Sequence, residues 1–254
     1  MQAAAPVDAE TVVVTPVPLP LIELLFVDDA IVVANKPSGL LVHRGWDDDD
    51  DVAMFRVRNQ IGQHVHPLHR LDRGTSGALV FARTREAAAT MARAFEEGRI
   101  DKRYLALVRG TPPDDGVIDY PIPKSEDGPR VDAVTRFRRI LRSPVDRCSL
   151  VEAIPETGRL HQIRRHLRHI NHPLVGDVRH GSGTINRHYR EVYGLHRLAL
   201  HALSIAFVHP VTGARIEVVA PLPPALTTVL EALALPTEVP TWAVTTVASG
   251  VTRA

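Results

Sequence analysis

The chain has 254 residues, which is enough for one large domain or two small ones with a sizeable core. Its composition, 44% hydrophobic and 23% charged, is that of an ordinary soluble globular protein. A single cysteine, Cys148, excludes an internal disulfide and fits a reducing cytoplasm, while the N-terminus lacks a signal-peptide pattern and no stretch approaches a membrane span.

In the first half of the chain the pattern predicts short strands and one helix. The helix has Thr84 as its expected N-cap and Gly98 at its end, with Ala88, Met91, Ala92 and Phe95 as its apolar face. The expected elements are a flexible arm over 1–20, two short strands within 21–44 that turn at Asp28 and Asp29, a solvated loop over 47–51, a buried strand over 78–83, the helix over 84–98, and a strand over 103–110.

The second half continues with the same mixture of elements. They are a helix over 158–171, a loop over 176–183, paired strands over 200–210 and 215–221, a last helix over 223–233, and a loose tail over 236–254. Strands often follow each other directly and helices are few. We therefore predict one α+β domain over 21–235, with a mixed, mainly antiparallel sheet flanked by helices.

The charge is distributed unevenly, although the net charge is only +1. Residues 47–51 are five consecutive aspartates. Between Arg159 and Arg190, seven arginines and six histidines are accompanied by one acidic residue, Asp177. A stretch with so little acidic compensation indicates that one face of the protein meets a polyanion.

The segment PLHRLDRGTSGALV places Asp72 between Arg70 and Arg73, at the start of the expected buried strand. Burial disfavours an ionised carboxylate, whereas nearby guanidinium groups favour it. A carboxylate that is desolvated and still ionised can act as a nucleophile or a base. The alternative is structural: Asp72 then forms an ion pair or an Asx-turn with the residues that follow.

The expected helix over 158–171 has one apolar stripe, formed by Leu160, Ile163, Leu167 and Ile170. Arg164 lies at the margin of this stripe and needs a carboxylate partner, for which Asp72 is the candidate. The rest of the helix is cationic, and we interpret this face as binding phosphates, with a plain solvated face as the alternative.

Two other patterns allow chemistry. Tyr104, which follows Lys102 at the start of its strand, could stack on a base or exchange a proton, or it could simply pack. His64, His66 and His69 have spacing that zinc sites use, which keeps a metal hydrolase as an alternative. Pro67 interrupts the regular geometry and no cysteine pair supports this reading, so we expect no metal.

The segment HRLDRGTSG (69–77) resembles the signature of the RluA-type pseudouridine synthases. Segments 28–44, 102–110, 157–177 and 197–213 are similar to further motifs of that family, in the same order, so the resemblance covers about residues 21–230. It implies the pseudouridine synthase fold with a central catalytic cleft. It also implies an isomerase that converts a uridine of RNA into pseudouridine and needs no cofactor and no metal.

Finer features, in 42–46, 58–65 and 176–202, are similar to the branch of the family that modifies uridine 65 of tRNA. The resemblance implies tRNA as the partner of a cytoplasmic enzyme, without a membrane or a protein partner, and we expect a monomer. The stretch 121–151 is shorter than in that branch. The alternatives are therefore the same chemistry on rRNA or on another tRNA uridine, or a non-catalytic RNA-binding module.

The resemblance also implies residue roles. Asp72 would be the catalytic aspartate that attacks the ribose or the base, Tyr104 the tyrosine that handles a proton, and Arg164 the partner of Asp72. The target nucleotide must be turned out of its helix, at a cost of a few kcal/mol. The residues expected to bind the substrate are Arg70, which would displace the target nucleotide, Thr75, Lys102, Arg159, His161, Arg165 and Arg168.

Overall fold

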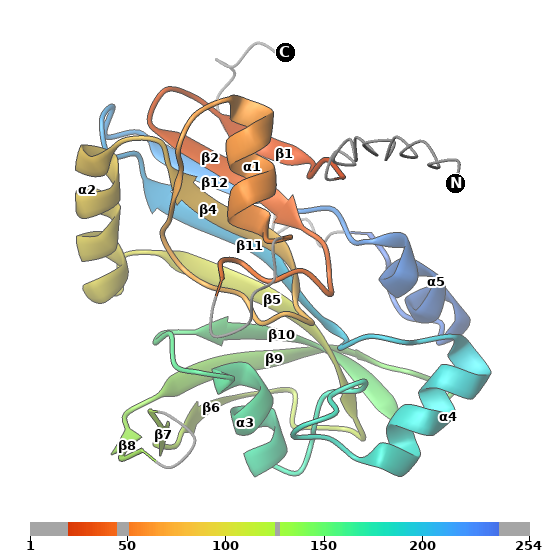
Figure 1. Ribbon diagram of the computed structural model, residues 1–254. Coiled ribbons are helices and arrows are strands. Elements are labelled where there is room, and N and C mark those ends of the chain that lie inside the picture. Colours follow the sequence, from red (N-terminus) through yellow and green to blue (C-terminus); the bar gives the residue numbers. More distant parts are fainter. Residues whose placement is uncertain (1–19, 45–50, 125–127, 239–254) are drawn as a thin grey trace, which may run out of the picture.

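The computed structural model describes residues 20–44, 51–124 and 128–238, and one large sheet runs through them (Figure 1). The elements in chain order are β1 (Leu24–Val27), β2 (Ile31–Lys36), α1 (Ala53–Ile61), β3 (His66–Pro67), β4 (Ser76–Ala82), α2 (Arg85–Glu96), β5 (Asp101–Arg109), β6 (Asp115–Asp119), β7 (Ile122–Pro123), β8 (Arg130–Val131), β9 (Val134–Arg142), β10 (Cys148–Pro155), α3 (Gln162–His169), α4 (Gly183–Tyr193), β11 (Leu200–Val208), β12 (Arg215–Val219) and α5 (Pro224–Ala232).

The main sheet has the strand order β1-β2-β4-β11-β5-β10-β9-β6, with β12 paired to β11 and β3 to β4. Its pairs are antiparallel except for β4 and β11, which are parallel over His201 and Ala202. This arrangement confirms the predicted α+β class with a mainly antiparallel sheet. The late strand β11 lies between β4 and β5, so it joins the two halves of the sheet.

Helices cover both faces of the sheet. On one face, α1 packs with Leu79 and Phe81 of β4, and α3 packs with Ala106 and Val108 of β5. Because side chains alternate along a strand, the neighbouring residues of β4 and β5 face the other way, toward α2 and toward α4 with α5. Figure 1 shows α1 and α3 in front of the sheet. Tyr104 packs against the clusters under both helices and lies between them.

Gly77 allows β4 and β11 to approach each other closely. Its φ of +113° is unfavourable for other residues, and a Cβ atom there would lie 2.2 Å from the carbonyl oxygen of Ala202. Only glycine fits at this contact. The segment that carries Asp72 is therefore anchored to the centre of the sheet directly after it ends.

Several predicted elements are confirmed. The turn at Asp28 and Asp29 separates β1 from β2, and β4 is buried along its whole length. In α2 the Thr84 hydroxyl accepts a hydrogen bond from the backbone N–H of Ala87 at 3.1 Å, as expected of an N-cap. The strands β11 and β12 pair around their turn, and α5 occupies most of the expected last helix.

Other expectations were wrong in part. In α2, Met91 is buried and Ala88 and Phe95 pack against the same core cluster, as predicted, but Ala92 is exposed and Ala87 and Ala94 complete the buried face. The helix expected over 158–171 is shorter, because His161 has left-handed backbone angles (φ 54°) and α3 begins only at Gln162. The sequence pattern did not reveal α1 or α4. Neither has a side-chain hydrogen bond at its N-cap or an acidic residue in its first turn, although Ser182 precedes α4 and Gly194 follows it.

The expected arm over 1–20, the loop over 47–51 and the tail over 236–254 lie almost entirely outside the described residues. Asp51, the described end of the aspartate run, forms an ion pair with Arg56 of α1 at 2.5 Å. In the described part of the chain, no helix has both the length and the apolar character required to span a membrane.

Candidate active site

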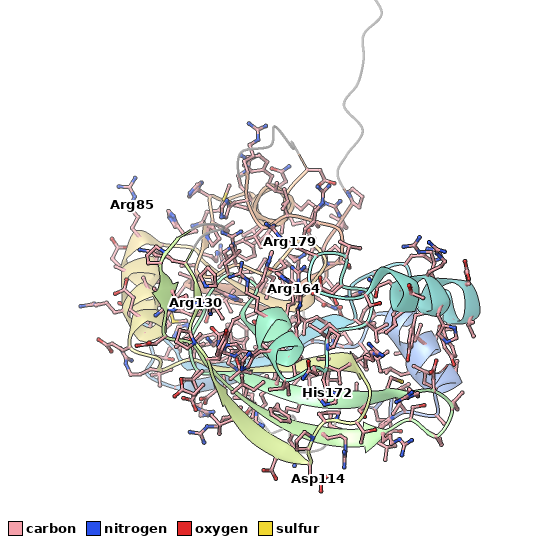
Figure 2. The ribbon with its side chains drawn as sticks, turned by 90° about the horizontal axis from the view of Figure 1, so that it is seen from below. Arg85, Asp114, Arg130, Arg164, His172 and Arg179 are labelled. Atoms are coloured by element: carbon pink, nitrogen blue, oxygen red, sulfur yellow. The ribbon has the colours of Figure 1, made fainter. Side chains whose placement is uncertain are left out.

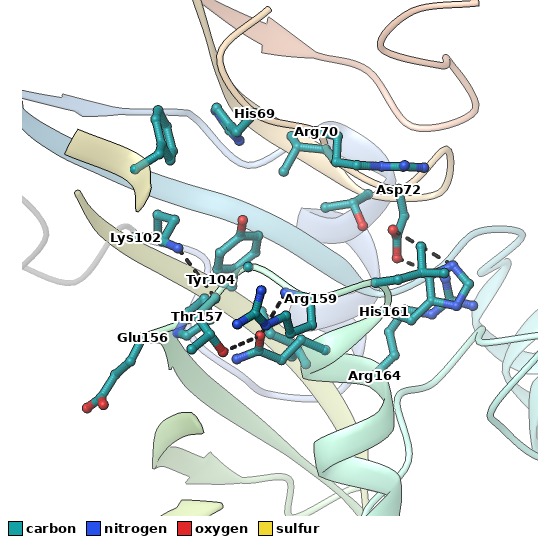
Figure 3. A pocket seen from close by; sticks show the side chains of 18 of the residues that line it. His69, Arg70, Asp72, Lys102, Tyr104, Glu156, Thr157, Arg159, His161 and Arg164 are labelled. Carbon is teal, nitrogen blue, oxygen red and sulfur yellow. Dashed lines mark hydrogen bonds and ion pairs between the residues drawn. The ribbon is translucent and has the colours of Figure 1, made fainter. Parts of the chain in front are cut away.

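A cavity of about 600 Å³ lies between the loop that precedes β4, the first residues of β5 and the start of α3. Asp72, Tyr104 and Arg164 all line it (Figure 3). These are the three residues to which the sequence assigns catalytic roles. The fold thus brings them from three separate elements to one cavity.

Asp72 lies in a tight turn, where the backbone N–H of Thr75 donates to its carbonyl oxygen at 3.0 Å. Its side chain is 19% exposed, so the carboxylate is largely shielded from water and still accessible from the cavity. Arg73 is exposed, but its Nε donates to the carbonyl of Gly39 at 2.9 Å and its own carbonyl accepts from the Gly39 N–H at 2.7 Å. The turn is fixed to the loop after β2.

Lys36 also holds this turn in place. Its side chain is fully buried, and Nζ donates to the carbonyls of Leu40 at 2.6 Å, Pro37 at 2.9 Å and Arg73 at 3.3 Å. Burial lowers the pKa of Lys36 to about 7, and the positive charge of Arg197 acts in the same direction. This lysine is not among the predicted site residues, although a lysine inside an apolar strand pattern is a visible signal.

Arg164 bridges two carboxylates. Its Nη1 donates to Oδ2 of Asp72 at 2.9 Å, while Nε and Nη2 donate to the two oxygens of Asp177 at 2.7 and 2.8 Å. The side chain of Arg164 is only 9% exposed. The bidentate pair with Asp177 fixes the plane of the guanidinium group, which in turn fixes the carboxylate of Asp72.

Asp177 is the acidic residue of the cationic stretch, and the sequence analysis assigned it no role. Its side chain is fully buried, and Oδ1 also accepts the backbone N–H groups of Arg179 and His180 at 2.9 Å. Burial by itself would raise the pKa of Asp177, but the hydrogen bonds from Arg164 and from these backbone groups hold the pKa below its usual value. Asp177 therefore remains ionised and keeps Arg164 in position.

A pair of histidines extends from Asp72, with His161 beside its carboxylate and His180 behind His161. Nε2 of His161 lies 3.9 Å from Oδ1 of Asp72, and its Nδ1 lies 3.0 Å from Nε2 of His180. Burial lowers the pKa of both rings, to about 4 for His180. Both rings are thus neutral at neutral pH and share one hydrogen bond. The left-handed backbone of His161 is the local feature that turns its ring toward Asp72.

Tyr104 and Lys102 form the opposite side of the cavity (Figure 3). Burial raises the pKa of Tyr104, and the nearby charge of Asp72 raises it further, so the phenol stays protonated at neutral pH. Burial also lowers the pKa of Lys102, whose Nζ donates to the carbonyl of Thr157 at 3.5 Å. The cavity therefore offers a neutral hydroxyl group opposite an anchored carboxylate.

The structure places five of the seven expected substrate-binding residues at the cavity: Arg70, Thr75, Lys102, Arg159 and His161. Arg70 is exposed and Thr75 is buried. Arg165 and Arg168 lie on α3 outside the cavity; Arg165 donates to the carbonyl of Pro123 at 3.2 Å, and Arg168 is exposed.

The three histidines with zinc-like spacing do not converge. His69 is buried against Phe95 with 5.2 Å between ring centroids, and its Nε2 accepts the backbone N–H of Val80 at 3.1 Å. The rings of His64 and His66 contact each other edge to face. Within the described residues, no three potential ligands gather in a way that could hold a metal ion.

This geometry agrees with the comparisons with known proteins. The family model for RNA pseudouridylate synthases matches residues 30–169. The chain belongs to this family, and it is accordingly a pseudouridine synthase, an isomerase.

Its relatives include proteins named tRNA pseudouridine synthase C. That of Vibrio parahaemolyticus is 41% identical over 213 residues, which cover 76% of this chain and 87% of the relative. That of Salmonella typhimurium is 44% identical over 214 residues, which cover 76% of this chain and 82% of the relative. Among solved structures, human RNA pseudouridylate synthase domain containing 4 superimposes with a TM-score of 0.68 at 28% identity and covers 84% of this chain and 93% of its own.

Proposed function

We propose that this pseudouridine synthase acts on tRNA and that its target is uridine 65. The observation that carries the proposal is the carboxylate of Asp72, anchored 2.9 Å from Arg164 in a cavity of about 600 Å³. The choice of tRNA is supported by the relatives, which are named tRNA pseudouridine synthase C. The cationic face around α3 also supports a polyanionic substrate.

In the proposed reaction the target uridine is turned out of its helix and enters the cavity. Asp72 attacks as the nucleophile, at either the ribose or the base, and the glycosidic bond between nitrogen and carbon breaks. The uracil then rotates and binds again through carbon C5. C5 loses a proton and N1 gains one, so the reaction consumes no other reactant. It requires only side chains that stabilise charge and transfer protons.

Turning out a stacked nucleotide costs a few kcal/mol. Phosphate contacts from the exposed arginines around the cavity offset this cost, and Arg70 lies at the rim, where it can take the place of the displaced nucleotide. The cavity walls exclude water on the Tyr104 side, which favours re-bonding of the uracil over its loss.

The target is tested by mapping pseudouridine in tRNA and rRNA from cells with and without this gene. We expect the modification to disappear from position 65 of tRNA alone. Loss at another tRNA position or in rRNA would overturn the proposed target and leave the chemistry intact. Unchanged maps in both RNA classes would contradict the proposed function.

We expect Tyr104→Phe to lower kcat by about 100-fold or more, because the variant loses a positioned proton donor and acceptor. KM should change by less than about threefold, since the aromatic ring that contacts the base is retained. The control is Tyr120→Phe, because Tyr120 stacks on His169 and does not line the cavity. An unchanged kcat in Tyr104→Phe would remove the tyrosine from the proton pathway.

We expect Arg165→Ala and Arg168→Ala to weaken tRNA binding and each to reduce the slope of log Kd against log salt by about 0.7–0.9, the value for one lost phosphate contact. Their kcat at saturating tRNA should stay unchanged. Arg215→Ala is the control, because Arg215 is exposed and paired with Asp101 on another strand. Salt slopes equal to that of the control would show that this face of α3 does not meet phosphate.

A further inference from the structure

A second cavity lies at the end of β5 that is remote from Tyr104. Its volume is about 560 Å³, and its lining includes three arginines from three segments: Arg109 at the end of β5, Arg142 at the end of β9, and Arg147 just before β10. Gly110, Thr111, Asn171 and His172 complete it. No acidic side chain contributes to this lining. We call it the arginine pocket.

The backbone around the arginine pocket is fixed. The N–H of Arg109 donates to the carbonyl of Pro173 at 3.0 Å, and Nδ1 of His172 donates to the carbonyl of Arg109 at 2.9 Å. Gly110 donates to the carbonyl of Arg147 at 2.7 Å and accepts from the Ser149 hydroxyl at 2.8 Å. The φ of Gly110 is +76°, and a Cβ there would lie 3.2 Å from Nδ1 of His172. The pocket therefore has a preformed floor.

The arginines of this pocket differ from others on the sheet. Arg103, Arg139 and Arg215 each form an ion pair with a carboxylate. Among the described residues, the guanidinium groups of Arg109, Arg142 and Arg147 make no ion pair and no hydrogen bond with the protein. Three like charges at one pocket repel each other unless an anion compensates them, and a guanidinium fork matches the oxygens of a phosphate group.

The arginine pocket is connected to the active site through α3. Arg164, near the start of this helix, binds Asp72, whereas His172 follows its end, and Figure 2 shows the two side chains on different sides of α3. Along β5, the five residues from Tyr104 to Arg109 span about 17 Å. The exposed Arg168 lies near the end of α3, between the two sites in the sequence. An RNA strand bound along α3 would have to extend past Arg168 to bring its backbone to the pocket.

We propose that the arginine pocket binds a backbone phosphate of the RNA substrate, remote from the target uridine. This contact distinguishes RNA that extends beyond the modified stem from RNA that does not. The proposal rests on the proposed function, since it assigns this contact to tRNA. The pocket contributes affinity for full-length tRNA and takes no part in the chemical step. A short hairpin that contains only the target stem does not reach it.

The test compares the double variant R142Q/R147Q with R93Q/R215Q, which removes two exposed arginines that lie outside the cationic stretch 159–190. Full-length unmodified tRNA and a short hairpin with the target uridine serve as ligands. We expect R142Q/R147Q to raise Kd for tRNA at least tenfold and to reduce its salt slope by about 0.7–0.9, the value for one lost phosphate contact. Kd for the hairpin and kcat at saturation should stay within about twofold of the wild type.

Several outcomes would overturn the proposal. They are an unchanged Kd for tRNA, an equal loss on the hairpin, and an equal loss in R93Q/R215Q. A further outcome is that the wild type binds inorganic phosphate, that R142Q/R147Q does not, and that Kd for tRNA is unchanged. This result would mean that the pocket binds a free anion and not RNA. Failure of the proposed function would appear separately, because the wild type would then form no pseudouridine in either RNA.

Discussion

Replacing Asp72 by Asn is expected to abolish pseudouridine formation, with a loss of at least about 10⁴-fold in kcat, because an amide is neither a nucleophile nor a base here. Asparagine keeps the size of the side chain, and its carbonyl oxygen can still accept the hydrogen bond from Arg164. RNA affinity should therefore fall by less than about tenfold. The measurement is single-turnover formation of pseudouridine in unmodified tRNA, alongside a direct binding assay.

The result separates an enzyme from a module that only binds RNA. A binding module would tolerate the loss of the carboxylate, whereas a synthase would not. Asp72→Ala serves as a second variant, since alanine cannot regain an acid by slow deamidation. Turnover in both variants close to that of the wild type would contradict the assignment of Asp72 as the catalytic nucleophile. A circular dichroism melt of each variant controls for unfolding.

Arg164→Ala is expected to cause the largest loss of stability, about 3–5 kcal/mol in the free energy of unfolding, because it leaves the fully buried carboxylate of Asp177 without its partner. It should also remove turnover, since Asp72 loses its anchor. Denaturant unfolding and the single-turnover assay measure the two effects. A stability close to that of the wild type would show that water or another donor satisfies Asp177.

A second substitution distinguishes the stability effect from the catalytic one. In the Arg164→Ala background, Asp177→Asn removes the uncompensated charge and should recover at least about 1 kcal/mol of stability without restoring turnover. Recovery of turnover would mean that Arg164 acts only through the fold and not on Asp72.

The ion pair between Arg164 and Asp177 also determines how the free energy of unfolding changes at low pH. The folded-state pKa of Asp177 lies below its unfolded value of about 3.9. The ionised carboxylate therefore contributes stability that is fully present above about pH 4 and is lost as the pH falls through the lower folded pKa. We expect the stability difference between the wild type and Asp177→Asn to shrink below pH 4.

Much of the fold could be predicted because its elements carry local signals. The strand β4 is a continuous apolar run, and Thr84 is a standard cap for α2. The helix α1 follows Val52, which is not a capping residue, whereas α4 was missed although Ser182 precedes it and Gly194 follows it. The start of α3 was misplaced because the left-handed residue there is His161 rather than glycine or asparagine, the usual residues in that conformation.

The residues of the candidate site also fall into two groups, those that a sequence pattern marks and those that it does not. Asp72, Tyr104 and Arg164 stand in distinctive patterns, and the position of Arg164 beside an apolar stripe already indicated a buried carboxylate partner. Asp177, Lys36 and His180 could not be placed from the sequence. Their function depends on contacts with residues 13 to 37 positions away in the chain, a separation over which no periodic pattern is informative.

The central position of β11 has a consequence for biosynthesis. The half of the sheet with Asp72 and the half with Tyr104 are held together by a strand that begins only at Leu200. A nascent chain still short of that residue lacks the strand that aligns the two halves. The ribosome must therefore translate past β11 before the protein can act on the RNA around it.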